Sequence, residues 1–340
     1  MNRSPELKVG FGMINEIILQ PIRSILLRTS LEIGVFDVLS DFTSSIDVSK
    51  RLGTHHDNTR YLLDGLASCD LVEKNNQMYR NTEMSRLYLV SESANYMGSY
   101  IQLYQRSLID ALDDLTEMVQ KGSIPSPPKV VDGSYDEFEE YVKALASAAK
   151  GGTARIAARI VSQQPEFPTM RRMLDIGGGP GIIAMAIVDP HPFMKGVIFE
   201  QPAMAEVARK NISDFGMEDR MEVISGNFLT DPLEESFDLI WTSFCLYFAK
   251  HHLDETIKKI FEALEPGGIF ISLHEGLNEE GTKPEILVLP NIAMNMNGHD
   301  TAFESGEIVE AMRRSGFSDV RSRPEDSPFG EVEVVIGKKE

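Results

Sequence analysis

The stretch MLDIGGGPG, residues 173–181, decides the fold of this chain. A short apolar run ends at Asp175 and Ile176, and four of the next five residues are glycines. A glycine-rich turn between a strand and a helix lets a ligand approach the backbone, and the amino end of the helix favours an anionic group. Close packing of the strand on the helix also explains such a turn, so the surrounding residues must separate the two interpretations.

Two carboxylates accompany the glycine turn. Asp175 precedes it, where it would repel a nucleotide phosphate, and Glu200 ends the next apolar run. An acid at the end of that strand can accept hydrogen bonds from both hydroxyls of a ribose. The turn also lacks the lysine of a phosphate-binding P-loop. Together these features predict a ligand that contains adenosine but no phosphate, and S-adenosylmethionine fits that description.

The pattern around the turn predicts an α/β fold. From residue 171 onward, short β-rich runs alternate with helical stretches at 181–189, 202–216 and 253–265, and EVEVVIGKK (331–339) reads as a last strand. Strands that alternate with helices form βαβ units and a mostly parallel sheet. We expect this domain to cover residues 121–340, after a linker-like stretch at 122–134.

The first part of the chain, residues 1–120, predicts a mainly helical domain. Two short helices precede a hairpin at 71–82, with its turn at Asn75–Asn76, which is the order of a winged helix. A winged helix suggests DNA binding, but residues 47–80 carry five acidic and five basic side chains rather than a basic footprint. A homodimer formed by this half is the better interpretation, because its helices carry many apolar positions. These positions are Ile17, Ile18, Ile25, Leu26, Leu31 and Val35.

Composition narrows the class further. The chain has 340 residues and a formal net charge of −19, which disfavours nucleic acid as a partner. No apolar run is long enough to span a bilayer, and the N-terminus lacks the apolar core of a signal peptide. Cys69 and Cys245 are the only cysteines, which excludes a disulfide framework and a cysteine-based zinc site. We expect a cytoplasmic protein that uses no metal and does not insert into a membrane.

Several motifs resemble one family. LDIGGGPG, FEQP, RMEVISGNF, EALEPGG and NGHDTAFESGEIVEAMRRSGF are similar to the class I small-molecule O-methyltransferases, which include caffeate-type, acetylserotonin-type and bacterial tailoring enzymes. The resemblance covers essentially the whole chain. It implies a Rossmann-like domain with a seven-stranded sheet, an N-terminal winged-helix dimerisation domain, and conversion of S-adenosylmethionine to S-adenosylhomocysteine.

The resemblance also implies roles in cofactor binding. Asp175 would lie near the methionine end, Gly177 and Gly179 would line the cofactor through their backbone, and Glu200 would hold the ribose. Gln201, the next residue, is also expected to bind the cofactor. Asn227 stands where the family usually has Asp beside the adenine, and its amide oxygen can still accept a hydrogen bond. Phe228 would pack on the adenine ring. Ser243 stands where many members have Lys, so that contact departs from the family pattern.

The catalytic segment departs further. Caffeate-type enzymes carry a base histidine in an LHDW motif after the fourth sheet strand. Counting forward from FD puts Tyr247 at that position, whereas counting back from EAL puts Leu246 there. His251 and His252 lie later and are expected to begin the following helix. An ordinary phenol has a pKa near 10, so Tyr247 suits positioning of the acceptor better than general-base catalysis.

Other catalytic candidates follow from the resemblance. Glu275 and Asp300 match the two supporting acids of the family. His299, beside Asp300, is a candidate base in a loop expected to line the acceptor pocket, whereas strand alternation favours a packing role for His274. The further residues Met294, Met296 and Phe303 are either pocket lining or ordinary core.

The leading hypothesis is methyl transfer from S-adenosylmethionine to a small aromatic or polycyclic acceptor, with O-methylation favoured. C-methylation of the pigment-biosynthesis type is an alternative, because the pigment branch resembles this chain in having LY at the Tyr247 position. A family member that binds the cofactor for a non-methyltransferase role, and a winged-helix regulator, are the remaining alternatives.

Overall fold

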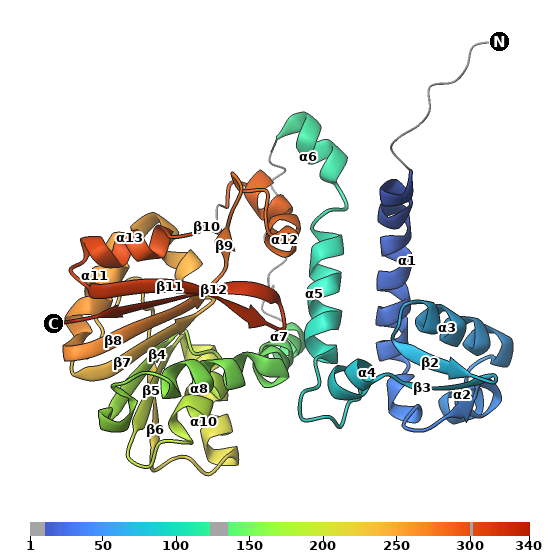
Figure 1. The fold of residues 1–340 in the computed structure, drawn as a ribbon, viewed down its shortest axis with the longest axis horizontal. Helices are drawn as coiled ribbons and strands as arrows, with labels where there is room; N and C mark the ends of the chain where they lie inside the picture. The colour runs from blue at the N-terminus through green and yellow to red at the C-terminus, as the bar shows by residue number, and fades with distance from the viewer. Residues whose placement is uncertain (1–10, 123–134, 300–301) are drawn as a thin grey trace. The chain divides into compact units, whose positions relative to one another are not determined.

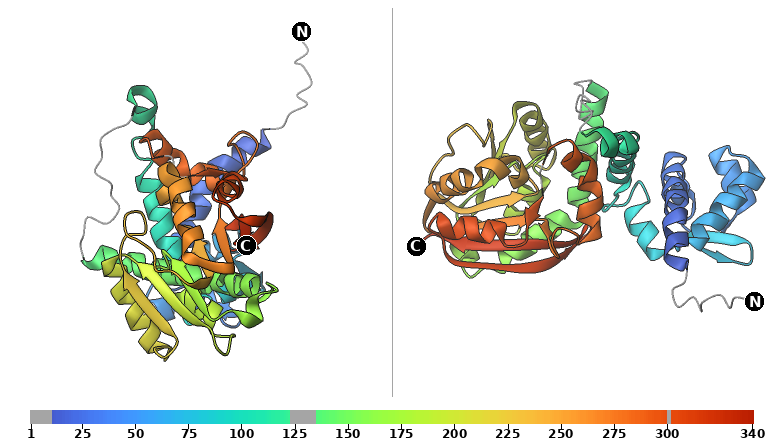
Figure 2. Two further views of the ribbon diagram at one scale, coloured as in Figure 1. Left: turned by 90° about the vertical axis from the view of Figure 1, so that its left-hand side faces the viewer. Right: turned by 90° about the horizontal axis from the view of Figure 1, so that it is seen from above.

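The structure is a computed structural model that describes residues 11–122, 135–299 and 302–340. The chain divides into two compact units, Met1–Gln105 and Arg106–Glu340. Each unit has its own hydrophobic core. Figure 1 and Figure 2 show the helices and strands of both units. Among the described residues no helix combines the length and the apolar character that crossing a bilayer requires.

The N-terminal unit contains short helices and a small antiparallel sheet with strand order β1-β3-β2. Its elements are α1 (Gly12–Glu32), η1 (Phe36–Val38), β1 (Thr43–Ser44), α2 (Ser45–Leu52), α3 (His56–Ser68), β2 (Val72–Asn75), β3 (Met78–Asn81), α4 (Glu83–Tyr88) and the start of α5 (Gly98–Asp110). This confirms the predicted helical domain with a hairpin. The register pairs Asn75 with Met78, so the two-residue turn is Asn76–Gln77 rather than Asn75–Asn76. Both turn residues have positive φ, as this type of hairpin loop requires.

The core of the N-terminal unit corrects part of the dimerisation hypothesis. Leu31 and Val35 are 9% and 0% exposed and pack inside the unit, so they are not available to a second copy. Ile17, Ile18 and Ile25 on α1 are about half exposed or more, at 64%, 58% and 48%. Among the predicted positions, Ile17, Ile18 and Ile25 on α1 therefore provide the exposed apolar surface for association with a second copy.

The C-terminal unit is built on a seven-stranded sheet with order β11-β12-β8-β7-β4-β5-β6. The neighbouring strands β6, β5, β4, β7 and β8 run parallel to one another. Next to β8, the strands β12 and β11 pair in the antiparallel direction and form one edge of the sheet. The strands are β4 (Arg172–Ile176), β5 (Lys195–Glu200), β6 (Met221–Ser225), β7 (Phe237–Ser243), β8 (Leu264–His274), β11 (Ser318–Ser327) and β12 (Gly330–Lys338), beside the short pair β9 (Gly276–Leu277) and β10 (Phe303–Glu304). The predicted mostly parallel sheet is confirmed.

Helices cover both faces of this sheet, as Figure 1 shows. The helical elements of this unit are α6 (Leu115–Lys121), α7 (Tyr135–Ala148), η2 (Ala149–Thr153), α8 (Ala154–Ser162), η3 (Phe167–Thr169), α9 (Ile182–Val188), α10 (Pro202–Asp214), η4 (Leu246–His252), α11 (Leu253–Ala263), α12 (Glu285–Met296) and α13 (Glu307–Arg314). Helices α8, α9 and α10 pack on one face, and α11 and α13 pack on the other. The helical stretches predicted at 181–189, 202–216 and 253–265 are α9, α10 and α11.

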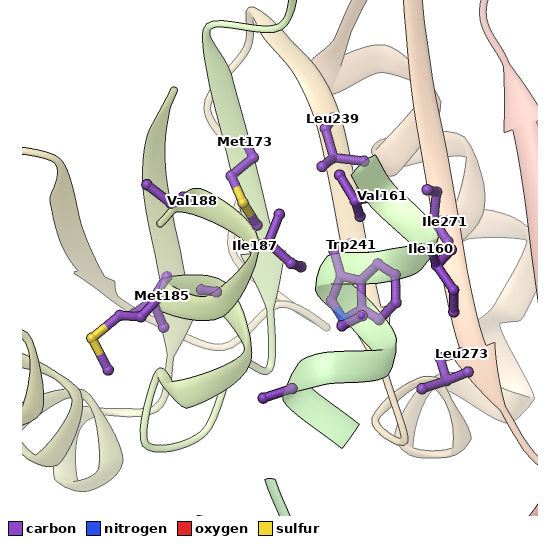
Figure 3. Packing of buried hydrophobic residues seen from close by; sticks show 14 of the residues in the cluster. Ile160, Val161, Met173, Met185, Ile187, Val188, Leu239, Trp241, Ile271 and Leu273 are labelled. Carbon is purple, nitrogen blue, oxygen red and sulfur yellow. The ribbon is translucent and has the colours of Figure 1, made fainter. Parts of the chain in front are cut away.

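The core on the α8 face is centred on Trp241 of β7, which is fully buried (Figure 3). Leu239 of the same strand and Ile271 of β8 point toward the same helices, as alternation along a strand requires. Full burial of a large apolar side chain of this kind stabilises the folded state by roughly 1.5–3 kcal/mol relative to leaving it exposed. This packing holds the carboxyl ends of β4, β5, β7 and β8 together at one end of the sheet.

Candidate functional site

The glycine turn follows β4 directly and leads into α9. Gly177, Gly179 and Gly181 all have positive φ, at 65°, 54° and 80°, which side-chain-bearing residues adopt only with strain. A Cβ on Gly178 would lie 2.8 Å from Oδ2 of Asp175. Both interpretations of the glycines therefore hold in part, because packing as well as ligand access requires a bare backbone here.

Glu200, at the end of β5, meets this turn. Its Oε2 accepts a hydrogen bond from the backbone N–H of Gly179 at 2.8 Å, and its Oε1 accepts one from the N–H of Gln201 at 2.7 Å. Gln201 itself is exposed at the amino end of α10. The turn and the strand-end acid, which are separate motifs in the sequence, thus form one cluster.

Asp175 lies beneath the same turn and is fully buried. Neither of its carboxyl oxygens has a hydrogen-bond partner among the described residues. Burial first, and the nearby Glu200 carboxylate second, raise the pKa of Asp175 well above its usual range. A buried carboxyl group without a donor is costly, so its presence indicates a ligand that supplies one.

The remaining predicted cofactor residues follow the next strands. Asn227, after β6, uses its side-chain oxygen to accept from the N–H of Leu229 at 3.0 Å, which shapes the local turn. Phe228 is half-buried and packs against the core on the α11 face. Ser243 is half-buried at the end of β7. These positions lie at the same sheet edge as Glu200 because parallel strands end there together.

A small recess, partly open to solvent, lies at the ends of β7 and β8. Tyr247, on η4, and Glu275, directly after β8, both line it. The full lining is Phe244, Cys245, Leu246, Tyr247, His274, Glu275, Leu277, Leu287, Asn291, Ala302 and Phe303. The structure thus brings two of the four predicted catalytic residues together in one apolar recess.

The other predicted catalytic residues are placed differently. His299 is exposed after the end of α12 and does not line the recess, and Asp300 lies outside the described residues. His251 and His252 are exposed and immediately precede α11. Of the apolar candidates, Phe303 lines the recess, whereas Met294 and Met296 are partly exposed on α12 and do not.

Burial shifts the pKa of two titratable groups that line the recess. Burial raises the pKa of Tyr247 well above its ordinary value, and the neighbouring Tyr141, Cys245 and Glu275 add to this effect. Burial also raises the pKa of Glu275. A phenol with a raised pKa is a poor base near neutral pH, so Tyr247 is suited to donating or orienting a hydrogen bond.

Three residues at the site were not predicted from the sequence to belong to it, and His274, which strand alternation assigned to packing, lines the recess together with Glu275. The Cys245 thiol donates to the Ile176 carbonyl at 3.1 Å and separates the recess from the glycine turn. Tyr141 belongs to α7, and burial and the Glu200 carboxylate raise its pKa. His274 is buried, with its Nε2 3.4 Å from Oε2 of Glu333. Only tertiary contacts bring these side chains to the site.

Comparison with known proteins places the chain in a family. The O-methyltransferase domain matches residues 130–318, and the O-methyltransferase dimerisation domain matches residues 16–91. The chain therefore belongs to the family of S-adenosylmethionine-dependent O-methyltransferases that act on small molecules. The dimerisation domain implies a homodimer.

Individual relatives are distant but span the chain. It is 27% identical to the N,N-dimethyltransferase OxyT of Streptomyces rimosus, over 92% of both chains. It is 24% identical to the 3-hydroxy-5-methyl-1-naphthoate 3-O-methyltransferase of Streptomyces sahachiroi, over 92% of this chain and 91% of the other. The structure of human N-acetylserotonin methyltransferase in complex with SAM aligns with a TM-score of 0.81 at 22% identity, over 100% and 99% of the two chains.

Proposed function

We propose that this protein transfers the methyl group of S-adenosylmethionine to a small, flat and largely apolar acceptor, with a hydroxyl oxygen as the favoured methylated atom. The observation that carries the proposal is the buried Asp175 carboxyl, which lacks a donor and lies beside the cluster of Glu200 and the glycine turn. A ligand with an ammonium group at one end and ribose hydroxyls at the other supplies donors to both acids.

The residues present fit this cofactor. Asp175 would face its amino-acid end, the backbone of Gly177 and Gly179 would line it, and Glu200 with Gln201 would hold the ribose. Asn227 and Phe228 would contact the adenine, and Ser243 lies at the same edge. When bound, the cofactor supplies an electrophilic sulfonium methyl group. In the described parts of the chain no group of three His, Cys, Asp or Glu side chains forms a potential metal site.

The residues of the recess would position the acceptor. Leu246, Leu277 and Phe303 provide apolar walls that exclude water, and Tyr247 and Glu275 supply the polar contacts. In-line positioning of the acceptor is the main contribution that such a site makes to methyl transfer. Tyr247 would orient the acceptor through its hydroxyl, and His299 and Asp300 stay candidates for contact with the acceptor until their variants are measured.

Methyl transfer to carbon is a second candidate, favoured by one observation. The pKa of Tyr247 is raised by burial, so the position where the family has a base histidine offers no base here. An activated carbon or an already acidic phenol needs little help from a base. Transfer from cofactor labelled with ¹³C in the methyl group separates the two outcomes, because O-methyl and C-methyl carbons resonate in different regions of the NMR spectrum.

Cofactor binding is tested by Glu200→Ala, measured by calorimetric titration with S-adenosylmethionine. Loss of the ribose acceptor should weaken binding by ~10–100-fold, which corresponds to about 1–3 kcal/mol. Glu222→Ala is the matched control, because it removes the same charge from an exposed glutamate on β6. Equal affinity in the wild type and the Glu200 variant contradicts the proposal.

A further inference from the structure

We propose that the acceptor recess selects molecules that carry a basic amine, and that Glu275 holds the protonated nitrogen. The inference rests on the proposed function, since it takes this recess as the acceptor site. It concerns which molecules bind, and the methylated atom can be a different atom of the same molecule.

The charge inside the recess is one-sided. Glu275 is the one carboxylate among the described residues that line it, and no lysine or arginine lines it. Within the described part of the chain, no side chain or backbone N–H donates a hydrogen bond to the Glu275 carboxylate. A half-buried carboxylate without a partner keeps its desolvation cost until a bound group compensates it.

The other walls suit a cation as well. The aromatic side chains of Phe244, Tyr247 and Phe303 line the same recess. Aromatic faces attract cations through their quadrupole, and the attraction grows when both groups are shielded from water. An ammonium group is therefore the ligand chemistry that satisfies both the carboxylate and the aromatic rings.

Acidic side chains behind the residues that line the recess also favour a cationic ligand. Glu333 lies 3.4 Å from the ring of His274, which itself lines the recess. The Glu200 carboxylate acts on Cys245, another lining residue. A negatively charged ligand would meet repulsion from several acids at once, so the recess discriminates against carboxylates and phosphates.

One cation lies close by but does not line the recess. The Lys250 ammonium donates to the carbonyl of Ala302 and lies 5.8 Å from the centroid of the Phe303 ring. Lys250 therefore ties residues 302–303 to η4.

The test compares three probes of one shape that differ in charge: 2-naphthylmethylamine, 2-naphthylmethanol and 2-naphthoic acid. Their binding to the full chain is measured by calorimetry at about pH 8, where the amine probe is protonated and the carboxylic acid probe is ionised. Titrations are run with and without saturating S-adenosylhomocysteine. Glu275→Gln removes the charge with little change of shape, and Glu265→Gln, at the exposed opposite end of β8, is the matched control.

The wild type and the Glu265 variant should bind the amine at least ~10-fold more tightly than the carboxylic acid. Glu275→Gln should abolish this preference and leave the affinity for the neutral alcohol within ~3-fold of wild type. Equal binding of amine and acid, an unchanged preference in Glu275→Gln, or failure of all three probes to bind overturns the inference. Failure of S-adenosylhomocysteine to bind overturns the proposed function instead, and the probe ratio still decides the inference.

Discussion

Replacing Gly177 by alanine separates the two reasons for a bare backbone at the glycine turn. Gly177 has φ 65°, and an added Cβ would lie 2.9 Å from Cβ and 3.0 Å from Sγ of Cys245. Gly216 has the same φ of 65°, but an added Cβ there meets no atom within 4 Å. Gly216→Ala therefore reproduces the backbone strain without the steric overlap.

The two costs can be estimated separately. A residue other than glycine in the left-handed region costs roughly 1–2 kcal/mol. Overlap with a well-packed neighbour costs typically about 1–3 kcal/mol more. Gly216→Ala should thus lower the free energy of unfolding by about 1–2 kcal/mol, and Gly177→Ala by about 2–5 kcal/mol.

Urea unfolding of the full chain measures these differences, and calorimetric titration reports cofactor affinity. Gly177→Ala should also weaken binding of S-adenosylmethionine, whereas Gly216→Ala should not. Adding Cys245→Gly removes both atoms that the new Cβ would meet, so the double variant should lose less stability than the two single losses combined. Equal destabilisation by Gly177→Ala and Gly216→Ala would refute the reasoning.

Further predictions concern catalysis, assembly and pH. Tyr247→Phe should lower the turnover rate by only ~10-fold, the worth of one hydrogen bond, in steady-state assays at saturating cofactor; a larger loss together with a flattened pH–rate profile would make Tyr247 the base. Ile17→Asp should shift the chain from dimer to monomer in light scattering, because Ile17 is exposed on α1, and a persistent dimer places the interface elsewhere. Burial by itself would raise the pKa of Glu325, but the ion pairs with Arg159 and Arg323 outweigh burial and lower this pKa in the folded state. The ion pairs therefore stabilise the folded state fully above the unfolded-state pKa of ~4.3, and this stabilisation is lost as the pH falls below that value. Glu325→Ala should therefore cost about 1–3 kcal/mol of unfolding free energy at neutral pH and much less in acid, measured by urea unfolding at both pH values.

Strand β11, at the edge of the sheet, shows where prediction of strands from the local sequence pattern fails. Residues 318–327 form β11, yet half of the stretch is charged and it contains Pro324. Because β11 lies at the edge and most of its side chains are exposed, it has no need for the apolar alternation that identifies a strand. The neighbouring β12 is buried, and its apolar residues predicted it correctly.

The sequence by itself determined the α/β fold, the glycine turn and the acids at the strand ends. These features are local, and parallel strands place their carboxyl ends at one edge whatever the details of packing. Tertiary structure alone decided that Glu200 contacts Gly179, that Cys245 and Phe303 share a recess with Glu275, and that His299 stays outside it. It also assigned Leu31 and Val35 to the core rather than to an interface. Such contacts join residues far apart in the chain, and periodicity within one segment carries no information about which distant segment will pack against it.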